Sequence, residues 1–192
     1  MIKESYLLKE LRKEVVILDT MRQLSYIELL ILLRRIMLDI KTVYNKLSIL
    51  PEKVKNKAFS KVMGIVIPFS AKSKFDIEKL KEGYMRVSIP YIKSNMNHIR
   101  THHALAMSEL GELATGVCLA YSLPKNSQVI LKSLSTEYLK KGKGKLTVEA
   151  EFNLSDIKDR GDVVFDVEIK NKSKETVAKA QYIWHYRINF KK

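Results

Sequence analysis

The stretch from Asn97 to Tyr121, NHIRTHHALAMSELGELATGVCLAY, decides the fold. Its spacing predicts a helix from about Thr101 to Tyr121, which would be roughly 30 Å long. Apolar side chains occur nearly all round this helix, so it is expected to be buried inside a domain. These apolar positions are Ala104, Leu105, Met107, Leu110, Leu113, Ala114, Val117, Cys118 and Tyr121.

One narrow row of the same helix is polar, and it contains two carboxylates. Glu112 is the unusual member, because a buried carboxylate is costly unless it is paired or functional. We take Glu112 as the leading catalytic candidate and Ser108 and Thr115 as candidate substrate contacts. A structural Glu112, bonded to a backbone group or a histidine, is the alternative. Glu109, one turn earlier, is expected to face solvent or an interface without a special role.

The residues before this helix also have helical spacing. One helix is predicted within residues 1–23, and a second starts at Ser25, which has capping-box spacing to Glu28, and runs to about Leu47. Its apolar stripe is expected to cover the core or a partner subunit, with flat insertion into a membrane surface as the alternative. A further short helical turn is predicted to begin at Pro51 and to end at Gly64.

Alternation of apolar and polar residues, typical of half-buried strands, occurs in five other segments. They are residues 84–91, 128–139, 145–154, 163–169 and 178–188. The order is therefore one strand, the long helix and four antiparallel strands. Because the helix has no polar face for water, the sheet must curl around it in an α+β arrangement. We predict an N-terminal helical extension over residues 1–50 and the α+β domain over residues 51–192.

Composition restricts the class of protein. The formal net charge is +14, but the lysines are spread along the chain, so a solvated basic surface is favoured over a nucleic-acid site. The single cysteine, Cys118, allows no disulfide framework and no zinc-type motif, which favours the reducing cytoplasm. No signal peptide or membrane-spanning run is recognised, so we expect a soluble protein. Peripheral membrane contact through the N-terminal helices stays open.

The order of elements and the motif before the helix resemble the hotdog fold. Within it the chain resembles the PaaI-like acyl-CoA thioesterases and, most closely, the DUF4442 branch, over roughly residues 50–190. Asn97, His103 and Glu112 keep the spacing of that motif, six residues and then nine. The family's His-Gly-Gly is here His103-Ala104-Leu105, its aspartate is Glu112, and its hydroxyl on the next strand has Ser133 as the nearest candidate. The resemblance implies thioester hydrolysis with acyl-CoA as substrate and without a metal or cofactor.

Thioester hydrolysis needs a carboxylate that activates water or attacks directly, and N–H donors directed at the developing oxyanion. Unpaired N–H groups at a helix start, here including Ala104, are suitable donors. His103 is expected to orient the loop or the substrate carbonyl, or to be purely structural, and Asn97 is expected to brace the loop. Ala104 and Glu112 are eight residues apart, about 12 Å along the helix, so they cannot both touch one carbonyl. We therefore expect sites shared across a homodimer, alone or within a dimer of dimers.

Lysines also cluster around the Gly142 and Gly144 turn. Lys140, Lys141 and Lys143 are candidates for binding the phosphates of CoA or the acidic helices of an acyl carrier protein, with a merely solvated turn as the alternative. A metal site built from His98, His102, His103 and Glu109 is not expected, because neighbouring histidines on a helix point apart.

Two other functions stay open beside hydrolysis. Hotdog hydratases and dehydratases pair a histidine with a glutamate fourteen residues on, as His98 and Glu112 are spaced, but their surrounding glycines and prolines are missing here. A non-catalytic acyl- or lipid-binding protein is the second alternative. DNA binding is disfavoured, because the N-terminal helices lack a basic recognition helix after a short glycine-containing turn.

Overall fold

The sheet has six strands, and every neighbouring pair is antiparallel. We describe it from a computed structural model of the chain, which covers residues 40–189. The strand order is β1-β2-β4-β5-β6-β3, so β1 and β3 form the two edges. The strands are β1 (Asp76–Lys81), β2 (Tyr84–Ile89), β3 (Gln128–Tyr138), β4 (Leu146–Glu151), β5 (Arg160–Lys170) and β6 (Thr176–Arg187).

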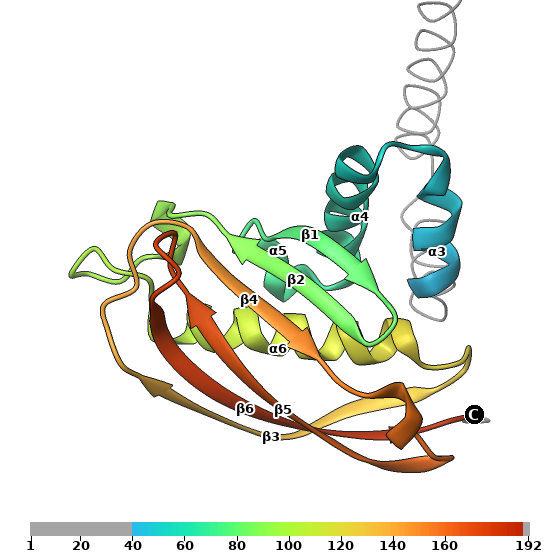
Figure 1. Ribbon diagram of the computed structural model, residues 1–192. Helices are drawn as coiled ribbons and strands as arrows, with labels where there is room; N and C mark the ends of the chain where they lie inside the picture. The colour runs from blue at the N-terminus through green and yellow to red at the C-terminus, as the bar shows by residue number, and fades with distance from the viewer. Residues whose placement is uncertain (1–39, 190–192) are drawn as a thin grey trace, which may run out of the picture. The chain divides into compact units, whose positions relative to one another are not determined.

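The long helix α6 (Ala104–Ser122) lies along one face of this sheet, and the strands extend around it (Figure 1). Leu110, Ala114, Cys118 and Leu119 are fully buried against the sheet. The buried helix that the sequence predicts is therefore confirmed. It begins three residues later than Thr101, because His103 is its N-cap.

Close packing between α6 and the sheet depends on two glycines of the helix. A Cβ on Gly111 would lie 2.7 Å from Cζ of Tyr182, and a Cβ on Gly116 would lie 2.7 Å from Trp184. Both aromatic residues also bond to the helix. The Tyr182 hydroxyl donates to the Ser108 carbonyl at 2.6 Å. The indole N–H of Trp184 donates to the Thr115 hydroxyl at 2.9 Å. Only glycine leaves room for these rings.

The predicted strands are present, but the sequence pattern misses β1. Its sequence, DIEKLK, is mostly charged, and the irregularity between Ile77 and Lys79 interrupts the alternation. Helix α4 covers this edge with side chains. The Asn56 side chain donates to the Glu78 carbonyl at 2.7 Å, and the Ile77 N–H donates to the Ser60 hydroxyl at 2.8 Å. Because α4 side chains bond to the backbone groups of β1, this edge is protected although β1 has few apolar residues.

Three α-helices precede the sheet in the described part of the chain. They are α3 (Ile40–Lys46), α4 (Glu52–Val66) and α5 (Pro68–Ala71), and short 3-10 helices occur at Leu47–Ile49, Lys93–Asn95 and Leu154–Asp156. The prediction that Gly64 ends a short turn is wrong, since α4 continues to Val66. Gly64 lies inside the helix and faces Ala71, and a Cβ on Gly64 would be 3.6 Å from that of Ala71, which is an ordinary contact.

Only the end of the apolar stripe predicted for the second N-terminal helix lies within the described residues. Tyr44 is buried and makes edge contacts with Phe59 and Tyr121, with ring centroids 5.0 and 5.4 Å away. The helices predicted within residues 1–39 lie outside the described residues, and the boundary near residue 50 stays a prediction. Within residues 40–189 no helix is both long and apolar enough to cross a bilayer.

Candidate active site

The side chain of Asn97 makes several hydrogen bonds within the loop before α6. Its side-chain oxygen accepts hydrogen bonds from the N–H groups of Ile99 at 3.1 Å and Thr101 at 3.0 Å. Its side-chain nitrogen donates to the Thr101 hydroxyl at 2.8 Å. All side-chain hydrogen bonds that it makes are local, so Asn97 acts by shaping the loop that presents the helix start.

His103 and Ala104 form the start of the helix. His103 is exposed, and its Nδ1 accepts the Leu105 N–H at 3.1 Å, so a neutral ring carries its proton on Nε2. No acceptor within residues 40–189 lies within bonding distance of the Ala104 N–H. This end of α6 therefore offers an unused donor together with the positive end of the helix dipole.

Glu112 lies near the middle of α6 and is half-buried. Its carboxylate makes no hydrogen bond or ion pair with any other residue that the structure describes. Burial raises its pKa. A carboxylate that is partly desolvated and unpaired is well suited to accept a proton from water.

Glu109 is not fully exposed to solvent, which was one of the two expectations for it, beside a position at an interface. It is half-buried, and its Oε1 is inaccessible and unpartnered among the described residues. Burial raises its pKa, and the negative charge of Glu112 one turn away adds to this effect. The side chains of Ser70 and Ser73, in and just after α5, act in the opposite direction. Sequence spacing could not reveal these neighbours, because Ser70 and Ser73 are more than thirty residues before Glu109 in the chain.

The hydroxyls that face α6 from the next strand are not the expected one. Ser133 is opposite Ile183, on the face of the sheet away from α6. An irregularity between Leu131 and Ser133 shifts the alternation, so that Thr136 and Tyr138 face the helix instead. The Ser108 hydroxyl lies 3.0 Å from the Thr136 hydroxyl and 2.7 Å from that of Tyr138. Strict alternation from Leu131 leads to Ser133 and not to Thr136 or Tyr138, so the sequence pattern gives no signal for these two hydroxyls.

The Thr115 hydroxyl already makes its hydrogen bonds within the core. Its hydroxyl donates to the Gly111 carbonyl at 2.9 Å and accepts the Trp184 indole N–H at 2.9 Å. It is completely buried, so the structure does not expose it beside Glu112. Of the two predicted substrate contacts on the helix, Ser108 lies closer to the helix start and bonds to the edge strand.

The lysine-rich turn docks on a buried histidine. The ring of His102 donates from Nε2 to the Gly144 carbonyl at 2.8 Å. The backbone N–H of His102 donates to the Gly142 carbonyl at 2.8 Å. Burial lowers the pKa of His102, which favours the neutral form of the ring. The nearby lysines 140, 141 and 143 are exposed, and the first pairs with Glu175 at 3.2 Å.

The described residues hold no metal centre. No group of three or more His, Cys, Asp or Glu side chains within residues 40–189 is close enough to bind an ion. Two of the histidines considered for such a site differ in their surroundings, since the His102 side chain is buried and that of His98 is not.

Comparison with protein families settles the relationship. The family model described as a domain of unknown function, DUF4442, matches residues 55–186. The chain belongs to the DUF4442 family. No curated protein matches it. In this DUF4442 protein the match includes the loop, α6 and the six strands except the last residue of β6.

Solved structures share its fold. A Pseudomonas aeruginosa protein described as a probable thioesterase is 23% identical, with a TM-score of 0.62 over 72% of this chain and 96% of its own. A thioesterase from Haemophilus influenzae is 15% identical, with a TM-score of 0.57 over 64% and 85%. A Streptococcus mutans protein solved with acetyl-CoA bound is 23% identical, with a TM-score of 0.52 over 61% and 91%. These likenesses confirm the predicted α+β hotdog fold of the DUF4442 protein.

Proposed function

We propose that this DUF4442 protein hydrolyses an acyl thioester, carried by CoA or by an acyl carrier protein, to the free acid and the thiol. The observation that carries the proposal is the half-buried, unpaired carboxylate of Glu112 on the central helix. Support comes from the shared fold, since the Haemophilus influenzae neighbour is a thioesterase and the Streptococcus mutans neighbour was solved with acetyl-CoA.

Each group has a role in this reaction. Glu112 takes a proton from water as the water attacks the thioester carbonyl, or attacks that carbonyl itself. The raised pKa makes the carboxylate a stronger base. The free N–H of Ala104 stabilises the negative charge that develops on the carbonyl oxygen, helped by the helix dipole. His103 orients the substrate carbonyl, and Asn97 holds the loop.

The proposed site needs two copies of the chain. Ala104 and Glu112 are eight residues apart on one helix, which is about 12 Å. The edge strand β3 offers a surface for a second copy. Leu134 and Tyr138 lie on the helix-facing side of β3, yet they are 44% and 43% exposed. We infer that a partner subunit covers these side chains and that the two copies supply the Ala104 N–H and Glu112 to one shared site.

The decisive variant is Glu112→Gln, which keeps size and hydrogen bonding but removes the base. We expect turnover of acyl-CoA substrates to fall by about 10²–10⁴-fold, the usual worth of general-base catalysis. Acyl-CoA binding and the melting temperature should change little.

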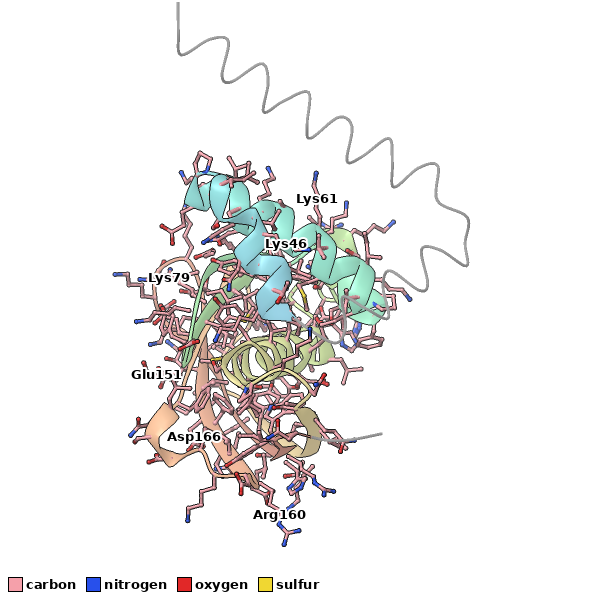
Figure 2. The ribbon with its side chains drawn as sticks, turned by 90° about the vertical axis from the view of Figure 1, so that its right-hand side faces the viewer. Lys46, Lys61, Lys79, Glu151, Arg160 and Asp166 are labelled. Carbon is pink, nitrogen blue, oxygen red and sulfur yellow. The ribbon has the colours of Figure 1, made fainter. Side chains whose placement is uncertain are left out.

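Glu151→Gln is the matched control, because Glu151 is an exposed carboxylate on β4, away from α6 (Figure 2). Equal losses in both variants would contradict a catalytic Glu112. A wild-type protein that binds acyl-CoA but turns over no thioester would instead establish the non-catalytic acyl-binding function.

A further inference from the structure

A groove apart from the two carboxylates is lined by residues of α4, of α5 and of the strands β1 and β2. It has a volume of about 940 Å³ and runs between α4 and the ends of β1 and β2. Its apolar lining consists of Gly64, Ile65, Ala71, Phe75, Pro90 and Tyr91. Four lysines, at positions 57, 61, 74 and 145, also line it. An apolar groove bordered by positive charge fits an occupant that has an apolar surface with negative charges beside it.

The positive charge around the groove is largely unneutralised. Residues 52–74, EKVKNKAFSKVMGIVIPFSAKSK, contain six lysines and one glutamate. None of these six forms an ion pair with a residue that the structure describes, whereas Lys145 pairs with Glu78. Asp76 is the only acidic residue lining the groove. Lys61 points outward from α4 into solvent (Figure 2).

The arrangement of the charges indicates the shape of the occupant. Lys57 and Lys61 are one helical turn apart, and the groove follows α4 from Lys57 to Ile65, which is about 12 Å. Charges repeating at this spacing match carboxylates one turn apart on another helix. A flat bilayer would not reach Phe75, a lining residue that is only 6% exposed.

We propose that this groove binds an acidic amphipathic helix of a partner protein. The apolar face of the helix would lie on Ile65 and Phe75, and its carboxylates would pair with Lys57, Lys61 and Lys74. This is the helix-in-groove mode of recognition, in which apolar anchors supply affinity and complementary charges supply orientation and association rate.

The position of the groove adds a functional consequence. The side chains of Ser70 and Ser73 lower the pKa of Glu109. Ala71, Lys74 and Phe75 of the same segment line the groove. The groove and the carboxylate pair therefore share one wall. A helix bound in the groove would place its protein beside the candidate active site. The binding itself does not depend on thioester hydrolysis.

The test uses the full-length protein and a fluorescent synthetic helix with glutamates at every fourth position and leucines on the opposite face. We expect saturable binding by fluorescence anisotropy that weakens with added salt. Lys57→Glu combined with Lys61→Glu should weaken binding by at least about tenfold, because attraction becomes repulsion. Gly64→Leu, which fills the groove without changing charge, should weaken it as well.

Lys158→Glu combined with Lys172→Glu is the matched control, since both lysines are exposed, lie outside the groove and give the same change in net charge. We expect it to bind within about twofold of wild type. Equal weakening in the two double variants would overturn the proposal, as would unchanged binding by Gly64→Leu. Failure to bind the peptide, together with binding to phosphatidylglycerol vesicles that the groove variants abolish, would overturn it in favour of a membrane surface.

Discussion

The two carboxylates of α6 show how one residue's surroundings decide its chemistry. Glu109 and Glu112 are one turn apart, and burial raises the pKa of both. Glu112 has no partner within the described residues, which suits a base. Glu109 has an inaccessible oxygen without a partner, which makes its charged form costly to the fold.

Glu109→Gln should make the protein more stable at neutral pH. A carboxyl whose pKa is raised by folding contributes stability below its unfolded pKa, about 4.3, and loses that contribution as pH rises through the higher folded value. Glutamine carries no such charge, so the gain over wild type should grow as pH rises from about 4.3 through the raised folded pKa and then level off. Thermal melts across this range measure it. A gain that is independent of pH would contradict the explanation.

The pH dependence of turnover follows from the same burial. Glu112 must be ionised to act as a base, so kcat/KM should rise with pH through a midpoint above the ordinary glutamate pKa of about 4.3. The measurement is a pH profile of kcat/KM, with protein stability verified at each pH. A midpoint at or below the ordinary value would show that another group limits the rate.

At the scale of elements, the contact between α6 and the sheet depends on the absence of two side chains. Gly111 and Gly116 allow Tyr182 and Trp184 to reach the helix backbone and its buried hydroxyl. Helix propensity alone would favour alanine at both positions by about 1 kcal/mol. Tertiary packing therefore outweighs local preference here.

Gly111→Ala should destabilise the protein by about 1–3 kcal/mol, because the new Cβ overlaps the Tyr182 ring. Gly64→Ala in α4 is the matched comparison, since its Cβ would make an ordinary contact at 3.6 Å. That variant should gain up to about 1 kcal/mol from helix propensity. Urea unfolding of both variants gives the two values. A loss of similar size in both would rule out the steric explanation.

At the scale of the whole molecule, β3 is the exposed edge that a second subunit would cover. Edge strands with exposed apolar residues are prone to association. Leu134 is part of this edge, whereas Leu154 is similarly exposed, at 39%, on the 3-10 helix after β4. The two leucines therefore separate interface effects from general surface effects.

Leu134→Glu should dissociate the proposed dimer and abolish turnover, because each site would lack either Glu112 or the Ala104 N–H. Sedimentation velocity and the thioesterase assay, performed at the same micromolar concentration, measure both effects. Leu154→Glu should leave both unchanged. An active monomer of about 22.2 kDa would disprove sites shared between subunits.

The sequence by itself determined the buried helix, the strands from β2 onward and the position of Glu112 on the helix. These features follow from local periodicity, because a continuous apolar surface or strict alternation has few folded solutions. The resemblance of Asn97, His103 and Glu112 to a known motif supplied the family.

Only the tertiary structure decided which groups surround those residues. The irregularity in β3 turned Ser133 away and brought Thr136 and Tyr138 to the helix. The tertiary structure also placed Ser70 and Ser73 near Glu109, and it brought α4 against β1 beside the groove. In each case the deciding contact joins segments far apart in the chain, whereas periodicity reports only which face of its own element a residue occupies.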